Sequence, residues 1–274
     1  MDLNTVTEIV RPRRRAELPA WQAGDAWLAG GTWLFSEPQL ALTRFIDIVD
    51  FGWPALQITE QGLQIAATCK IAELDGTTYP SNWTATLLFN QCCRSFLASF
   101  KIWNMATVGG NLCMALPAGP MISLTAALEG TCTIWTPAGD ERRVAVTDFV
   151  LGPQRNALLP GELLHSIALP LAALSRRTAF RQISLAPLGR SAALLIGTVS
   201  PDDGTFALTV TASTPRPTRL SFPAIPTRGA LRERHEAEIQ HYYDDVHGAP
   251  AWRRHMTLQF AEEIRQELAG EGPK

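Results

Sequence analysis

The N-terminal part of the chain alternates between short apolar runs and small or polar breaks, a pattern typical of short strands mixed with helices. Runs of four or five apolar or alternating residues fit strands, and longer apolar stretches fit helices. Two further runs flank the turn sequence Pro137-Ala138-Gly139-Asp140 and predict a hairpin. Strands are expected at 26–29, 45–49 and 63–66, helices at 71–74, 87–101 and 121–128, and the hairpin at 131–135 and 142–146.

The pattern changes after a predicted strand that ends at Pro170 and a polar linker at 175–177. Three alternating segments, two of them joined by the Pro-Asp-Asp-Gly turn at 201–204, predict an antiparallel meander. The sequence therefore predicts an α+β protein, with a two-lobed domain over residues 1–172 and a sheet packed with helices over residues 173–274. The meander strands are expected at 178–185, 192–199 and 205–212, and the closing helices at 230–243 and 251–268.

The composition narrows the class of partner. Of the 274 residues 46% are hydrophobic and 18% charged, which is a globular composition, and the formal net charge is −2. Binding to nucleic acid or to an acidic membrane requires a basic excess, so neither is expected. No stretch of about 18 apolar residues predicts a membrane span, and the first residues do not resemble a signal peptide, so a cytoplasmic protein is expected.

Neither the cysteines nor the histidines have the spacing of a metal site. No Cys-x-x-Cys pair occurs, so this chain alone is not expected to hold an iron–sulfur cluster, and scattered thiols suit a reducing cytosol. Four histidines near the C-terminus are six to eight residues apart in polar sequence and are expected to be solvated. The cysteines are Cys69, Cys92, Cys93, Cys113 and Cys132, and the histidines are His235, His241, His247 and His255.

Two loops with paired glycines, at 29–32 and 106–111, are the candidate binding elements. Glycine permits positive φ and lets a ligand approach the main chain, and successive backbone N–H groups form an anion-binding concavity. Threonine and asparagine side chains in these loops add partners for phosphate or ribityl oxygens. A single glycine pair is usually only a tight turn, and the sequence has neither the Rossmann nor the P-loop motif. The residues alone thus indicate a nucleotide-cofactor site or two structural turns.

The same loops resemble the FAD-binding signatures of the medium subunit of molybdenum hydroxylases, the group of xanthine dehydrogenases and carbon monoxide dehydrogenases. The first stands here as A-G-G-T-W-L at 29–34, and the second as I-W-N-M-A-T-V-G-G-N at 102–111. The resemblance extends over nearly the whole chain, through F-I-D-I at 45–48, L-P-G-E-L-L at 159–164 and W-R-R-H at 252–255.

The resemblance implies a two-lobed FAD-binding domain that acts as the electron-transfer subunit of a three-part oxidoreductase. A large partner subunit would carry the molybdenum cofactor and a small one two [2Fe–2S] clusters, and electrons would pass through FAD to NAD or another acceptor. In that setting the chain holds and tunes the flavin and supplies no acid–base catalyst. The matching FAD-binding positions are Ala29, Gly30, Gly31, Thr32, Trp33, Thr107, Val108, Gly109, Gly110, Asn111, Leu163 and Leu164.

Three positions depart from the resemblance. Trp103 replaces an arginine, Pro120 an aspartate after the second loop, and Gln182 a lysine. These changes motivate a flavin-free structural subunit as the alternative function. A free-standing flavin oxidase is a further alternative, although nothing in the sequence resembles a substrate-activating acid or base. For Leu163 and Leu164, ordinary core packing is as good an explanation as contact with the flavin ring.

Overall fold

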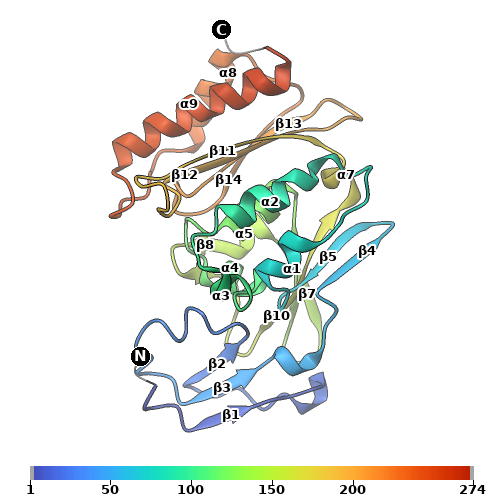
Figure 1. Ribbon diagram of the computed structural model, residues 1–274, viewed down its shortest axis with the longest axis vertical. Coiled ribbons are helices and arrows are strands. Elements are labelled where there is room, and N and C mark those ends of the chain that lie inside the picture. Colours follow the sequence, from blue (N-terminus) through green and yellow to red (C-terminus); the bar gives the residue numbers. More distant parts are fainter. Residues whose placement is uncertain (1–2, 272–274) are drawn as a thin grey trace.

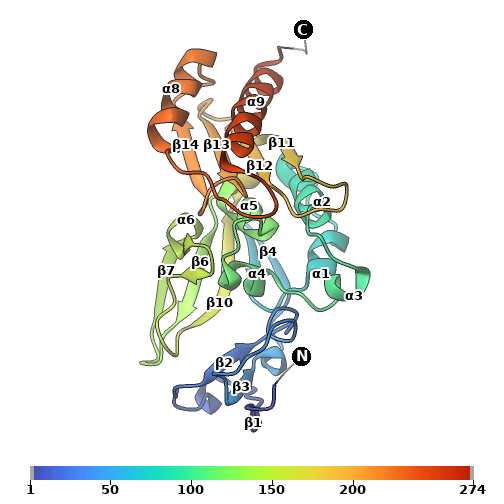
Figure 2. The same ribbon diagram turned by 90° about the vertical axis from the view of Figure 1, so that its left-hand side faces the viewer.

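The computed structural model describes residues 3–271 and has three sheet-containing layers along its long axis (Figures 1 and 2). The N-terminal lobe lies at one end, the C-terminal helices lie at the other, and a sheet with several short helices fills the middle. In residues 3–271, no helix combines the length and the apolar character needed to cross a bilayer.

The N-terminal lobe is a small parallel sheet of order β1-β3-β2. Phe45 and Ile46 from its central strand are buried, and a buried ion pair fixes one edge. There Arg44 donates to both oxygens of Asp25, at 2.8 and 2.7 Å, which lowers the pKa of that carboxyl. The predicted strands at 26–29 and 45–49 are confirmed within two residues. The strands are β1 (Glu8–Val10), β2 (Asp25–Leu28) and β3 (Arg44–Asp47).

The middle layer is an antiparallel sheet of order β4-β5-β10-β6-β7. Its central strand, β10, comes from far along the chain and pairs with β5 on one side and β6 on the other. The predicted hairpin is confirmed as β6 and β7. The strands are β4 (Leu56–Thr59), β5 (Gly62–Ala66), β6 (Thr131–Trp135), β7 (Glu141–Ala145) and β10 (Leu163–Pro170).

Short helices cover one face of this sheet and enclose the larger hydrophobic core. The helices predicted at 71–74 and 121–128 are confirmed as α1 and α5. The principal helices are α1 (Ile71–Gly76), α2 (Leu87–Arg94), α3 (Phe100–Trp103), α4 (Val108–Met114) and α5 (Pro120–Ala127). Shorter elements are η1 (Arg15–Glu17), η2 (Val49–Phe51), η3 (Thr84–Thr86), α6 (Val146–Phe149), α7 (Leu171–Leu174), β8 (Val150–Gly152) and β9 (Arg155–Asn156).

The prediction of one helix over 87–101 is wrong, because the chain turns after Arg94 and begins a new helix at Phe100. At the end of α2, the Ser95 hydroxyl donates a hydrogen bond to the carbonyl of Gln91 at 2.9 Å. Such a side-chain bond to the backbone competes with continuation of the helix. The intervening segment instead contributes to the wall of a pocket described below.

The C-terminal sheet is an antiparallel meander, β11-β12-β13-β14, as predicted, with a fourth strand that the sequence pattern did not reveal. Its inner strands β12 and β13 are buried at every position, because α5 packs on one face of the sheet and α9 on the other. Leu194 and Ile196 therefore belong to the first core and Leu195 to a second core under α9. The elements are β11 (Arg177–Ile183), β12 (Ala193–Val199), β13 (Phe206–Thr211), β14 (Thr218–Phe222), α8 (Arg228–Glu238) and α9 (Pro250–Ala269).

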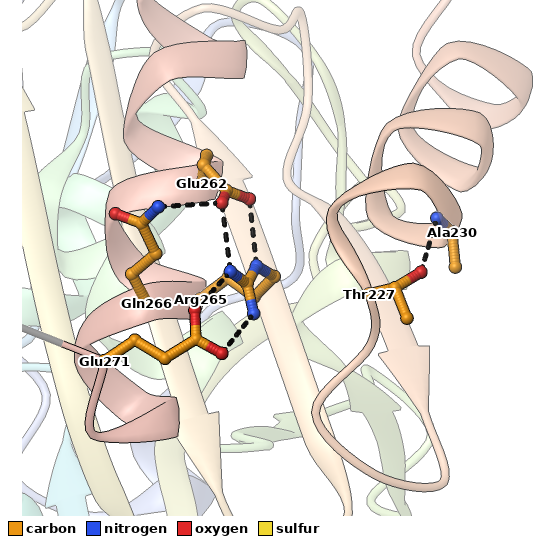
Figure 3. Close-up of polar contacts among 6 residues, drawn as sticks. All are labelled: Thr227, Ala230, Glu262, Arg265, Gln266 and Glu271. Atoms are coloured by element: carbon orange, nitrogen blue, oxygen red, sulfur yellow. Dashed lines mark hydrogen bonds and ion pairs between the residues drawn. The ribbon is translucent and has the colours of Figure 1, made fainter. Parts of the chain in front are cut away.

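Charged and capping groups hold the two closing helices (Figure 3). Near the end of α9, Arg265 donates to Glu262 at 2.9 Å and to Glu271 at 2.7 Å, so one guanidinium ties the helix to the residues that follow it. At the start of α8, the Thr227 hydroxyl accepts the N–H of Ala230 at 3.2 Å, which is an N-cap. Both predicted helices are confirmed, although α8 ends five residues earlier than expected.

The contact of α9 with the sheet depends on a missing side chain at Gly197. A Cβ there would lie 2.2 Å from the Ile264 side chain and 2.9 Å from Leu268. We expect Gly197→Ala to lower the free energy of unfolding by about 1–3 kcal/mol, the usual cost of overpacking a core. Urea denaturation measures it, and Ile264→Ala in the same chain should recover part of the loss. Equal stability of Gly197→Ala and the parent would contradict this contact.

His235 is fully buried, so the expectation that it is solvated is wrong. Its Nε2 lies 3.2 Å from the Tyr242 hydroxyl, whereas Nδ1 has no hydrogen-bond partner among the described residues. Burial, assisted by the charge of Arg254, lowers its pKa from about 6.5 to about 4.

The buried imidazole should make stability depend on pH. Between pH 6.5 and 4 the unfolded chain binds a proton that the folded chain does not, so stability falls with falling pH by up to about 1.4 kcal/mol per unit. Above pH 6.5 this group contributes no slope. We expect His235→Phe to reduce the difference between the urea unfolding midpoints measured at pH 7 and at pH 5. The control is His255→Gln, at an exposed position, which should leave that difference unchanged. An unchanged difference in His235→Phe would exclude His235 as its source.

Candidate functional site

A pocket of about 690 Å³ opens where loops from all three layers meet. The loop after β2, the segment from α3 into α4, the start of β10 and the loop between β11 and β12 all line it. Its volume lies in the range of small-molecule and cofactor sites, which are typically concave, apolar and provided with a few polar groups. Eleven of the twelve predicted FAD-binding residues line it, and the twelfth, Val108, is fully buried in the core.

The two glycine loops touch each other through their backbones. A Cβ on Gly30 would lie 1.8 Å from the carbonyl oxygen of Met105 and 3.2 Å from the Cα of Ala106. Any side chain at Gly30 would therefore force the loops apart. Gly30 is thus required by contact between two parts of the chain and does not by itself indicate a ligand.

The first loop presents unused amide groups to the pocket. Gly31 has a φ of +67°, and the chain then makes a helical turn in which the N–H of Phe35 donates to the Gly31 carbonyl at 2.9 Å. Within residues 3–271, no hydrogen bond takes the amide N–H groups of residues 30–34. Successive unpaired amides at the start of a helical turn form an anion-binding concavity. This loop is suited to hold a phosphate or diphosphate.

The second loop already uses its amides within the protein. Val108 and Gly109 donate to the carbonyls of Cys69 and Ala67 at 2.8 and 3.0 Å, and Gly110 donates to the Thr107 hydroxyl at 3.0 Å. A Cβ on Gly109 would lie 2.5 Å from Ala67, so this glycine too serves a contact within the chain.

The second loop therefore provides a ligand with space and with side-chain hydrogen-bond donors. A Cβ on Gly110 would meet only the Thr107 hydroxyl within 4 Å, so the missing side chain leaves room on the pocket side. The Thr107 hydroxyl retains its proton for a ligand. The Asn111 carbonyl oxygen accepts the N–H of Met121 at 3.1 Å, which leaves its NH₂ group to donate into the pocket.

Leu163 and Leu164 both line the pocket and are both nearly fully buried. A β-bulge between Leu164 and Ser166 interrupts the pairing of β10 with β6 here, as bulges often do next to binding sites. The Trp27 indole donates to the carbonyl of Glu162 at 2.8 Å, which places the ring on the same wall. Leu164 belongs both to the larger core and to the pocket wall, and Leu163 lines the pocket beside it.

The C-terminal layer supplies a group of polar side chains at the pocket that the sequence did not predict. Arg253 is buried to 1% exposure, donates to the carbonyls of Ala192 and Ala212 at 2.7 and 2.6 Å, and forms an ion pair with Asp245. It also donates to the Gly248 carbonyl at 2.8 Å. The motif W-R-R-H at 252–255 marked this arginine by resemblance only, and no local pattern showed that it reaches β12 and β13.

The three departures lie in different settings. Pro120 lines the pocket as the first residue of α5, a position that suits proline because the N–H is unpaired there anyway. Trp103 packs against the core outside the pocket lining, with the Arg94 guanidinium 5.0 Å from its ring centre. Gln182 donates to the Ser191 hydroxyl at 3.2 Å, and Ser191 lines the pocket. Pro120 alone therefore changes the pocket surface directly.

The five cysteines are unpaired, and only Cys113 lines the pocket. Burial raises the pKa of Cys93 and of Cys113 to about 12, so both thiols stay protonated. In the described part of the chain, no group of three or more histidine, cysteine, aspartate or glutamate residues is arranged to hold a metal ion.

The loop contact can be tested without any ligand. We expect Gly30→Ala to lower the free energy of unfolding by about 1–3 kcal/mol, because the methyl group and the Met105 carbonyl cannot share the same space. Thermal unfolding followed by circular dichroism measures this. Gly76→Ala is the control, because a Cβ at Gly76 has no neighbour within 4 Å. A Gly30→Ala protein as stable as the parent would contradict the contact.

Comparison with known proteins matches more than half of the chain to one family. The family model of the FAD-binding domain in molybdopterin dehydrogenase matches residues 6–172. Xanthine dehydrogenase of Oryza sativa subsp. japonica is 28% identical over 127 residues, and xanthine dehydrogenase 1 of Arabidopsis thaliana is 26% identical over 122. These matches cover 42% of this chain but only 9% of each relative, so the chain spans a small part of the length of the curated relatives it matches.

Solved structures extend the similarity to the C-terminal layer. A chain of carbon monoxide dehydrogenase from Oligotropha carboxidovorans superposes with a TM-score of 0.81 at 20% identity, covering 94% of this chain and 95% of that one. A chain of quinoline 2-oxidoreductase from Pseudomonas putida 86 superposes with a TM-score of 0.77 at 17% identity, and 99% of each chain is covered. At these identities the likeness concerns the fold.

Proposed function

This chain belongs to the family of FAD-binding domains in molybdopterin dehydrogenases, and on that premise we propose that its pocket holds FAD without a covalent bond. Its role would be that of the electron-transfer component of an oxidoreductase. The residues proposed to contact FAD are those of the two loops, 29–33 and 107–111, together with Leu163 and Leu164.

The unpaired amides of residues 30–34 carry this proposal. They form an uninterrupted series at the edge of a pocket large enough for a cofactor, and no described group of the protein satisfies them. Amide groups left without protein partners need water or a ligand, and a diphosphate accepts several of them at once. Thr107 and Asn111 from the adjoining second loop also line the pocket, and their side-chain donors suit ribityl or phosphate oxygens.

The remaining wall suits a planar aromatic ring. Leu158, Leu163 and Leu164 are apolar pocket residues from the middle layer, and the Trp27 ring lies beside them. When bound, FAD would supply the one- and two-electron chemistry, and the protein would bind, orient and shield it. Asp245 and His247 both line the pocket, but the Asp245 carboxylate is paired with Arg253 and accepts the backbone N–H of His247, and the Cys113 thiol stays protonated. This arrangement argues against substrate activation by a free-standing oxidase.

We further propose that the chain works beside a large subunit with the molybdenum cofactor and a small subunit with two [2Fe–2S] clusters. Electrons would pass from the clusters through FAD to NAD or another acceptor. In support, the five cysteines are dispersed, and the folds that superpose are chains of carbon monoxide dehydrogenase and quinoline 2-oxidoreductase. Unpaired thiols also fit a reducing cytoplasm. The proposed domain division is 1–172 for FAD binding and 173–274 for the C-terminal sheet and helices.

A flavin-free structural subunit is the second candidate, and Pro120 is the observation that favours it. Proline offers no side-chain polar group at a pocket position where the family resemblance has an aspartate. The other hydrogen-bond donors of the pocket, in the two glycine loops, are still present. The loss of the single contact at Pro120 would therefore weaken FAD binding less than the loss of a whole loop.

The visible absorption spectrum of the protein, produced with ample flavin, decides between these functions. We expect a yellow protein that releases FAD on denaturation, identified by chromatography against FMN and FAD standards. We also expect Gly110→Leu to reduce bound FAD at least tenfold, because the side chain would occupy the space beside Thr107. A tenfold loss corresponds to about 1.4 kcal/mol.

Gly229→Leu is the matched control. Gly229 also lies near the start of a helix behind an N-cap threonine, and a Cβ there meets only Thr227 at 4.0 Å. It should retain FAD at the level of the parent. A colourless parent protein would support the structural subunit, and a Gly110→Leu protein with its full FAD content would contradict the assigned pocket.

A further inference from the structure

Two arginines share one carboxylate where the C-terminal sheet meets α5, which lies beside that sheet in both views (Figures 1 and 2). The Oε1 atom of Glu129, two residues after α5, lies 2.6 Å from Nη2 of Arg219 on β14 and 2.8 Å from Nη1 of Arg176, just before β11. One negative charge therefore faces two positive charges. Burial lowers the pKa of the Arg219 guanidinium, Glu129 opposes this effect, and the charge of Arg176 adds to it.

Several N–H groups of these arginines are buried without an acceptor. Arg176 is only 9% exposed, and its Nε and Nη1 atoms have no hydrogen-bond partner within residues 3–271, although Nη1 is within ion-pair distance of Glu129. The Nε atom of Arg219 is buried without a partner in the same way. Burying a charged group without hydrogen-bond partners is costly, and a ligand or ordered water usually satisfies such a group. The cluster therefore lacks acceptors, which an anion would supply.

In the described part of the chain, no second carboxylate is bonded to either arginine. Asp203, exposed in the turn between β12 and β13, has a pKa lowered to about 2, mainly because the backbone N–H of Thr205 donates to it. The charge of Arg176 is the smallest cause of that shift, and no hydrogen bond or ion pair within residues 3–271 joins the two side chains. The cluster around Glu129 therefore keeps an excess of one positive charge.

The surroundings of the cluster are polar and can be reached from solvent. The strand register places Thr198 of β12 and Thr209 of β13 on the same face of the sheet as Arg219. The Thr198 hydroxyl is buried and also has no partner among the described residues. The side chain of Glu129 is 33% exposed, and Arg219 lines a cleft of about 580 Å³ beside α6. A small anion can therefore approach from the side of Glu129 and Arg219.

We propose that Arg176 and Arg219 form a binding site for a small inorganic oxyanion, such as phosphate or sulfate, beside Glu129. Such an anion accepts several N–H groups at once and matches the planar fork of a guanidinium group. The burial of Arg176 limits the space, which favours a free anion over a phosphate group on a larger molecule. The cluster joins the end of α5 to both edge strands of the C-terminal sheet, so a bound anion would hold this sheet against the middle layer. The inference does not depend on FAD.

Isothermal titration with inorganic phosphate at constant ionic strength tests the site. We expect Arg219→Gln to weaken phosphate binding at least about tenfold, because Arg176 and Glu129 would then neutralise each other. Glu129→Gln should instead tighten binding, because the competing carboxylate is removed, and a general loss of folding cannot produce this opposite change. The control Arg143→Gln, at an exposed position on β7, should bind as the parent does. In thermal unfolding, phosphate should raise the Tm of the parent and of Glu129→Gln, but not that of Arg219→Gln.

The other outcomes each overturn the inference. Equal phosphate binding by the parent, Arg219→Gln and Glu129→Gln would place the anion elsewhere, for example at the amides of residues 30–34. A parent protein that binds neither phosphate nor sulfate would leave water as the partner of the buried nitrogens. Phenyl phosphate, which carries a bulky group, should bind more weakly than phosphate, and equal affinity for the two would contradict a site for a free anion.

Discussion

The backbone contact between Gly30 and the Met105–Ala106 peptide determines where the rest of the site lies. Only a hydrogen fits between these two chain segments, so the loop after β2 is held directly against the segment that leads into α4. That contact joins the N-terminal lobe to the middle layer and closes one wall of the pocket. Gly31 then turns the chain with a positive φ, and the amides of the following residues, which line the pocket, have no partner among the described residues.

The C-terminal sheet completes the pocket because it is fixed from both sides. Its inner strands are buried between α5 and α9, and Gly197 allows α9 to approach closely. Arg253 at the start of α9 ties the ends of β12 and β13 together through the Ala192 and Ala212 carbonyls. The same bonds that stabilise this layer therefore hold the end of the loop between β11 and β12, which lines the pocket.

The sequence predicted β2, β3, β5, β6, β7 and the first three strands of the meander, and both glycine loops, because these depend on local pattern or on motifs, whereas β1 and β4 were missed. It could not predict that α2 stops at Arg94, since the apolar pattern continues through the turn at Ser95, nor that β14 pairs along β13. All four loop glycines were predicted to contact the ligand. The structure shows that Gly30 and Gly109 are needed for close contacts within the chain, which the sequence does not reveal. The role of Arg253 was likewise out of reach, because it arises from contacts with distant segments of the chain.

The most direct measurement is amide hydrogen exchange over residues 28–36, followed by mass spectrometry with FAD, with riboflavin and without ligand. A diphosphate that accepts hydrogen bonds from the amides of residues 30–34 should slow their exchange, and riboflavin, which has no phosphate, should not. We therefore expect protection with FAD alone. Equal exchange with and without FAD, in a protein that has bound it, would contradict the claim that these amides hold the cofactor.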